Sequence, residues 1–173
     1  YLVNSEPKVR KITPDGSVLT LAGSSSFGSE DGIGDAASFQ ELKAVAVDAE
    51  GYVYVVDDNK IRKISPAGVV TTLVDWLVSS NTTIKDLAVD GAGYLYVLKV
   101  HSGPYGTHGV LRISPDGNQT RDFAGTENGF LGGRGDEAKF YWPSGLAADA
   151  AGNVYVTSAS TYKTIHRITP LKY

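Results

Sequence analysis

The chain has 173 residues, of which 42% are hydrophobic and 10% aromatic, a composition typical of a globular protein. Its net charge is -3 without a basic run, which disfavours a nucleic-acid partner, and no apolar stretch is long enough for a membrane span. It contains no cysteine, which excludes disulfides, thiolate zinc sites and cysteine nucleophiles.

The sequence repeats itself with a period of about 50 residues, which indicates an array of small units. One apolar, Gly- and Tyr-containing phrase recurs at residues 44–55, 86–97 and 145–156. A second phrase carries an Arg, an Ile and then Ser-Pro or Thr-Pro, and it recurs at residues 10–16, 62–68, 112–117 and 167–170. Each unit is too small to bury its own faces, so neighbouring units must pack on one another.

In chain order, residues 1–23 predict three short strands, and the next unit predicts four. Those four strands lie at residues 45–48, 52–56, 60–65 and 69–74, separated by turns that contain Asp, Asn, Pro or Gly. Residues 86–124 repeat all four strands, and residues 145–170 repeat the first three. No segment has the 3.6-residue period of an amphipathic helix.

Short, hairpin-connected strands of this kind are typical of β-propeller blades, whose first strands converge and favour small residues. Such residues are Ala46, Ala88 and Ala147. We therefore predict an all-β fold, a β-propeller of four-stranded antiparallel blades with about three and a half blades. The predicted boundaries are a partial blade at 1–40, full blades at 41–84 and 85–142, and a partial blade at 143–173. Such a segment is part of a larger ring or half of a dimeric ring, and open blade edges invite self-association.

The units resemble NHL repeats, the blade unit of six-bladed and related propellers. The resemblance rests on residues 145–149, 152–156, 61–64 and 21–23, and on two parallel Gly-rich links at 31–39 and 132–140. The middle unit departs from the pattern, because Val74-Asp75-Trp76 replaces the Ala-Gly ending of the first unit. The resemblance implies a propeller, and a fold by itself does not assign a function.

One end of the predicted blades carries the variable loops. In an antiparallel blade, the turns after the first and third strands lie at one end, and the other connections lie at the opposite end. The turns are short and uniform, whereas the connections at 57–59, 99–109 and 158–164 vary in length. Binding sites collect on variable loops of a uniform scaffold. We therefore predict partner-binding residues there: Asp57, Asp58, His101, Tyr105, His108, Tyr141 and Trp142.

Each of these residue types also has a structural interpretation. We interpret His101 and His108 as solvated residues of a mobile loop, and Tyr141 and Trp142 either stack on a partner or pack between blades. The aspartates that recur before tight turns are expected to bond the N–H groups of those turns: Asp48, Asp90 and Asp149. The recurring arginines are expected to pack between blades with their charges paired at the surface: Arg10, Arg62, Arg112 and Arg167. His166 is expected to be a packed or edge residue of a strand.

No catalytic set can be assembled from the sequence, and no cofactor or metal is predicted. The favoured function is a non-enzymatic binding or scaffold domain that recognises a protein or carbohydrate partner, in an extracytoplasmic setting. The alternative is a metal-dependent propeller enzyme, a lactonase-like hydrolase or a lyase, which His101 and His108 suggest because imidazole is a common metal ligand. In the peptidyl-hydroxyglycine lyase, a propeller enzyme, histidines serve as metal ligands.

Overall fold

The computed structural model describes residues 1–3, 6–75, 77–78, 81–101, 107–125, 127–129, 131, 135, 137–158 and 163–169. Within them the chain is all-β, with sixteen strands and one short 3-10 helix, Gly34–Ala36. None of the described helices is long and apolar enough to cross a membrane. The chain divides into two compact units, which we call unit 1 (Tyr1–Leu77) and unit 2 (Val78–Tyr173) and describe separately.

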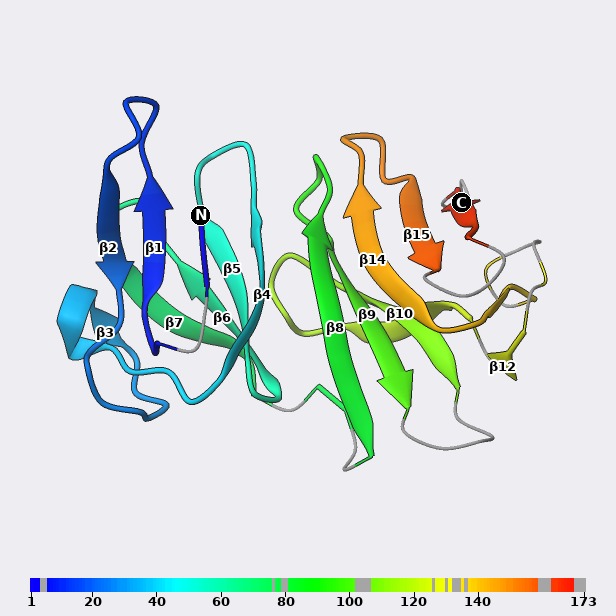
Figure 1. The fold of residues 1–173 in the computed structure, drawn as a ribbon, viewed down its shortest axis with the longest axis horizontal. Helices are drawn as coiled ribbons and strands as arrows, with labels where there is room; N and C mark the ends of the chain where they lie inside the picture. Colours follow the sequence, from blue (N-terminus) through cyan, green and yellow to red (C-terminus); the bar gives the residue numbers. More distant parts are fainter. Residues whose placement is uncertain are drawn as a thin grey trace. The chain divides into compact units, whose positions relative to one another are not determined.

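Unit 1 contains two sheets (Figure 1). The smaller sheet pairs β1 (Val9–Ile12) with β2 (Val18–Ala22). The larger sheet has the order β3-β7-β6-β5-β4, and its strands are Gly32–Ile33 (β3), Leu42–Val47 (β4), Val53–Asp57 (β5), Lys60–Ile64 (β6) and Val69–Val74 (β7). Strands β4 to β7 are consecutive antiparallel hairpins, as a propeller blade requires. Strand β5 is buried along its whole length, which explains its unbroken apolar sequence.

Unit 2 contains a four-stranded and a three-stranded antiparallel sheet. The first has the order β11-β10-β9-β8, with strands Thr82–Val89 (β8), Leu95–His101 (β9), His108–Ile113 (β10) and Thr120–Ala124 (β11). The second has the order β14-β15-β16, with strands Pro143–Ala148, Val154–Ser158 and Ile165–Ile168. A short parallel pair, β12 (Glu127–Asn128) and β13 (Lys139–Phe140), lies in the link between the two sheets.

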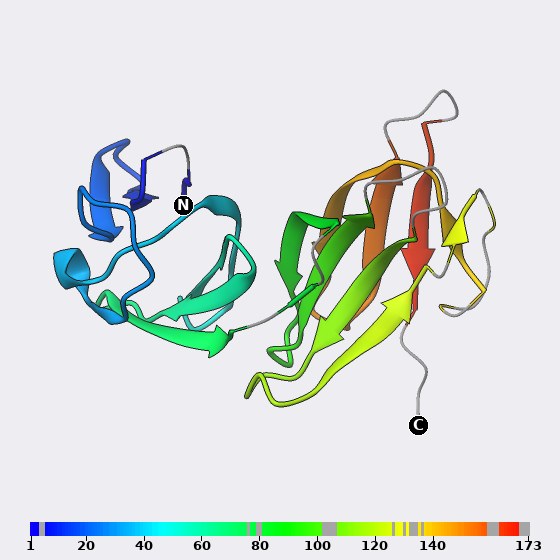
Figure 2. The same cartoon turned by 90° about the horizontal axis from the view of Figure 1, so that it is seen from below.

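The two sheets of unit 2 lie face to face (Figure 2) and enclose one apolar core. Tyr96 and Leu98 of β9 pack there with Val154 and Val156 of β15. Because side chains alternate across a strand, the residues of β9 and β15 that share this parity all point between the two sheets. Val100 of β9 and Ser158 of β15 share this parity.

The pairing registers identify the equivalent positions of the sheets. Ile64, Ile113 and Ile168 pair with Val53, Leu95 and Val154, respectively. The residue directly before the isoleucine is Lys63, Arg112 or Arg167, so these three positions are equivalent. Two residues before the isoleucine, the equivalent positions hold Arg62, Leu111 and His166. The grouping of Arg62 with Arg112 and Arg167 is therefore wrong. Lys63 and Arg112 each place their cation over an aromatic ring. Lys63 Nζ lies 4.4 Å from the centroid of the Tyr52 ring, and Arg112 Cζ lies 3.7 Å from the centroid of the Tyr94 ring.

Candidate functional site

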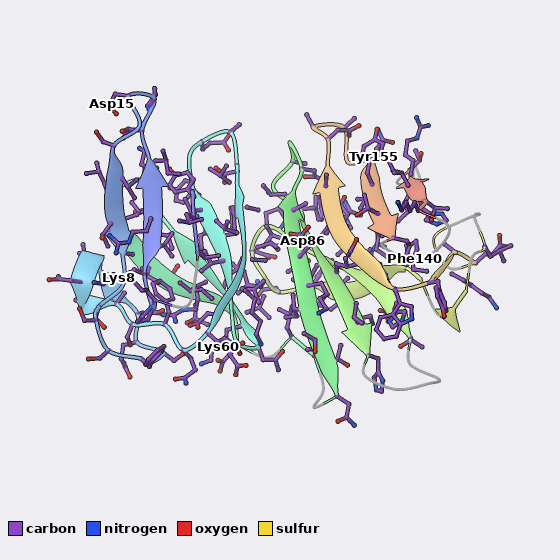
Figure 3. The ribbon with its side chains drawn as sticks, viewed as in Figure 1. Lys8, Asp15, Lys60, Asp86, Phe140 and Tyr155 are labelled. Carbon is purple, nitrogen blue, oxygen red and sulfur yellow. The ribbon has the colours of Figure 1, made fainter. Side chains whose placement is uncertain are left out.

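Each antiparallel sheet has a turn end, where the tight hairpin turns lie, and a connection end, where the longer links lie; in a complete blade the tight turns follow the first and third strands. In Figure 3, Asp15 lies at the turn end of unit 1 and Lys60 at its connection end. The aspartates of the turn ends are used by their own turns. Asp90 Oδ1 accepts from the Tyr94 N–H at 3.0 Å, and Asp90 Oδ2 accepts from the Tyr96 hydroxyl at 3.0 Å. Asp48 and Asp149 make the same two contacts, which confirms the predicted turn role.

The connection end of unit 1 is closed by a buried ion pair. Arg62 is 0% exposed, and its Nη1 donates to Asp57 Oδ2 at 2.8 Å, while Asp57 is 1% exposed. Arg62 Nη2 donates to Asp31 Oδ1 at 2.7 Å. The expectation of a guanidinium paired at the surface is therefore wrong for Arg62. The prediction that Asp57 faces a partner is also wrong, because a buried carboxylate cannot reach one.

Asp57 also holds the link that precedes β4. Its Oδ1 accepts from the backbone N–H of Gln40 at 2.7 Å and of Glu41 at 2.9 Å. Beside it, the Arg62 guanidinium lies 5.3 Å from the centre of the Phe39 ring. These contacts fix the link to the sheet, so the function of Asp57 and Arg62 in unit 1 is structural. Asp58, the next candidate, is exposed, has a left-handed φ of 54° and pairs with Lys43 at 3.3 Å.

The connection end of unit 2 has the same framework with different polar residues. Phe140 takes the place of Phe39, and His166 takes the place of Arg62, with ring centroids 5.7 Å apart. Ser158 takes the place of Asp57, because both end the strand that begins at Val53 in unit 1 and at Val154 in unit 2. Ser158 is 6% exposed, and its Oγ has no hydrogen-bond partner among the described residues. Two charged groups of unit 1 are thus replaced by a hydroxyl and an imidazole.

His101 and His108 lie in strands, not in a solvated loop as predicted: β9 extends to His101 and β10 begins at His108. His108 is 2% exposed, and the Nδ1 atom of each ring is buried without a hydrogen-bond partner in the described part of the chain. His108 pairs with Val100, so alternation directs His108 toward the second sheet and His101 to the opposite face. The two rings therefore do not converge on one point. Burial, with a smaller contribution from His101, lowers the pKa of His108.

Trp142 is more exposed than Tyr141, the other candidate aromatic residue that the structure describes. Its side chain is 57% exposed, and its backbone has a left-handed φ of 49°, a conformation that bulky residues rarely adopt. Its ring centroid lies 5.8 Å from that of His108, and the next residue, Pro143, pairs with Ser158. Trp142 thus lies beside His108, and the residue that follows it is paired with Ser158. Tyr141 beside it is also exposed, and Tyr105 lies outside the described residues.

Sequence reasoning missed Asp86, which is labelled in Figure 3. Its Oδ2 accepts from the Leu146 N–H at 2.7 Å, so it ties β8 of one sheet to β14 of the other. The equivalent positions hold Ala44 and Gly145, as the pairing registers show. A single acidic residue at a strand position that is otherwise small was the signal in the sequence. Among the residues that the structure describes, no three potential metal ligands cluster.

Comparison with known proteins supports the propeller. Among solved structures, a putative gluconolactonase matches 100% of this chain and 50% of its own, at 16% identity and a TM-score of 0.53. Virginiamycin B lyase from Staphylococcus aureus matches 98% of this chain and 50% of its own, at 11% identity and a TM-score of 0.51. A gluconolactonase from Xanthomonas campestris matches 95% of this chain and 69% of its own, at 17% identity and a TM-score of 0.52.

These likenesses show the fold: the chain is a partial β-propeller, and it spans half the length of the first two of these structures. Residues 25–101 match the family model of the teneurin NHL domain, which agrees with the NHL resemblance over that segment. No curated protein matches the chain.

Proposed function

We propose that this chain is a non-enzymatic binding domain that recognises a protein or carbohydrate partner through the connection end of unit 2. The observation that carries the proposal is Trp142, an exposed aromatic ring beside His108, whose buried Nδ1 has no hydrogen-bond partner among the described residues. Tryptophan and tyrosine supply large, rigid contact surfaces, and they are enriched where binding energy concentrates. Asp58 and Tyr141 remain candidate contacts.

The contrast with the turn ends supports this choice of end. There, Asp48, Asp90 and Asp149 are engaged by the backbone and by tyrosines of their own turns. At the connection end of unit 1, both terminal nitrogens of Arg62 are hydrogen-bonded, one of them to Asp57, and only the Arg62 Nε lacks a partner among the described residues. Polar groups that are already paired gain little from a partner, whereas an unpaired buried group gains a full hydrogen bond.

The enzymatic alternative has a separate test. His101 and His108 point to opposite faces of their sheet, which favours binding over metal chemistry at this pair. The lactonase and lyase activities belong to the matched proteins alone. Elemental analysis of the purified protein distinguishes the two functions: we expect no stoichiometric transition metal. One equivalent of zinc that disappears in the His101→Ala/His108→Ala variant would favour the enzyme. Self-association through blade edges and an extracytoplasmic setting stay predictions.

The proposal is tested by comparing three proteins on a glycan array and against a displayed peptide library. They are the parent chain, Trp142→Ala, and Val18→Ala as an exposed apolar control on β2. We expect at least one glycan or peptide class that the parent and Val18→Ala retain and Trp142→Ala loses at least tenfold. Equal retention by all three proteins would contradict the proposal, and product release from the retained ligand would identify an enzyme.

A further inference from the structure

The two units differ in charge at one pair of equivalent positions at their connection ends. In unit 1 the place is filled by the carboxylate of Asp57 and the guanidinium of Arg62, which neutralise one another. In unit 2 the equivalents are Ser158 and His166, and His166 Nε2 lies 3.1 Å from Thr164 Oγ1. Both formal charges are gone from this pair. The polar groups that remain at the place are hydroxyls and imidazoles, which suit a neutral hydrogen-bonding ligand better than an ion.

Two of these groups are buried and unpartnered. Ser158 Oγ and His108 Nδ1 have no hydrogen-bond partner among the described residues, although their side chains are 6% and 2% exposed. Ser158 has the parity of Val154 and Val156, so it points between the two sheets, and His108 points there from β10. A buried polar group without a partner destabilises the folded protein, so each such group in a native structure calls for an explanation, and a bound ligand supplies one.

Trp142 lies beside this place. Its ring is tilted by 44° to that of His108 at a centroid distance of 5.8 Å, and its left-handed backbone is a strained conformation for a bulky residue. Strain of this kind collects at functional sites. Because the Trp142 side chain is 57% exposed, its ring can offer a stacking surface to a ligand.

We infer that His108, Ser158 and Trp142 form a binding site for a neutral saccharide, whose ring stacks on Trp142 and whose hydroxyls bond to Ser158 Oγ and His108 Nδ1. This inference rests on the proposed function and narrows it to one ligand class. A sugar ring combines an apolar face with neutral hydroxyls that donate and accept hydrogen bonds. The three residues match both properties.

The test uses the fluorescence of Trp142 in the full chain. Trp76→Phe removes the other tryptophan, so that emission in this parent variant reports on Trp142 alone. Cellohexaose, chitohexaose and xylohexaose are titrated in turn. We expect a saturable change in emission with at least one of them, and a Kd at least tenfold weaker after Ser158→Ala or His108→Phe. Ser38→Ala, which changes a buried serine of unit 1, leaves the Kd unchanged.

A second variant separates binding from folding. Ser158→Asp/His166→Arg installs the ion pair of unit 1, and we expect it to remain folded by circular dichroism while it loses the saccharide. The inference is overturned if no hexasaccharide changes the emission of Trp142, or if Ser158→Ala, His108→Phe and the double variant bind like the parent. If the saccharides fail while Trp142→Ala still loses a peptide, the proposed function stands and the saccharide does not.

Discussion

Arg62 and Asp57 form an ion pair inside unit 1, with Nη1 and Oδ2 2.8 Å apart and both side chains removed from solvent. The equivalent residues of unit 2 are His166 and Ser158, so one framework is closed by charge in one unit and lined by neutral polar groups in the other. The pair in unit 1 holds the Gln40 and Glu41 amides, which ties a long link to the sheet. The difference between the units at this position is therefore one of charge, with a buried ion pair in unit 1 and neutral polar side chains in unit 2.

Asp57→Ala should destabilise the protein strongly, because it leaves the Arg62 guanidinium buried without its fully buried partner. Breaking such a pair costs about 3–5 kcal/mol. Urea unfolding followed by circular dichroism gives the free energy of unfolding. The control is Asp122→Ala, which removes the exposed partner of Lys99 and should cost at most about 1 kcal/mol. Equal losses in the two variants would contradict the buried network.

Gly125→Ala should destabilise more than Gly93→Ala, although both glycines have a φ of 80°. A left-handed backbone costs an alanine about 1–2 kcal/mol at either position. At Gly125 the new Cβ would lie 2.4 Å from the His108 carbonyl oxygen and 2.6 Å from the Phe140 ring, whereas at Gly93 its nearest neighbours are Pro115 atoms at 3.5 Å. Overpacking should add roughly 1–3 kcal/mol. Thermal unfolding tests this order, and matching midpoints would refute it.

The stability of the parent should fall on acidification through the window in which His108 titrates. Burial lowers its pKa in the folded state, whereas the unfolded value is about 6.5. Between these two values the unfolded chain binds more protons, so stability present above pH about 6.5 is lost as pH falls. His108→Gln lacks this contribution. Free energies of unfolding from pH 7.5 to 5 should converge for the two proteins as pH falls, and parallel curves would rule the explanation out.

Two buried serines should respond differently to removal of their hydroxyls. Ser38 Oγ accepts from the Glu30 N–H at 3.0 Å, so Ser38→Ala should cost about 1–3 kcal/mol. Ser158→Ala removes a buried hydroxyl without a partner in the described residues, so it should not lower stability and should raise it by up to about 1–3 kcal/mol. Guanidinium unfolding of both variants measures this, and a large loss at Ser158 would show that its hydroxyl is bonded in the folded protein.

Much of the fold could be predicted because its causes are local. Alternating apolar residues and turn aspartates such as Asp90 act within six residues, and the strand at 69–74 has the predicted bounds. Other features depend on distant residues. Arg62 becomes a buried residue because Asp31 and Asp57 reach it, and Asp31 lies 31 positions away in sequence. His101 and His108 extend a hairpin that the glycine- and proline-containing segment between them had marked as a loop.

The candidate site also has residues that the sequence indicates and residues that only the structure identifies. Trp142 and His108 were found from their position on a variable end, whereas Ser158 had no signal of its own and stands out only beside Asp57. Asp57 itself was misread as a contact residue, since sequence alone does not show that an arginine neutralises it. The strand pairing in the structure aligns Ser158 with Asp57, and this alignment identifies the role of both residues.

Saccharide binding at the connection end of unit 2 is tested most directly by nitrogen–proton correlation spectra of the isotopically labelled chain, titrated with the same three hexasaccharides. We expect shifts of the Trp142 indole and of the amides of Ser158 and His108, with the turn amides of Tyr94 and Asn153 unchanged. Shifts centred on those turns or on unit 1, or no shift with any hexasaccharide, would contradict it.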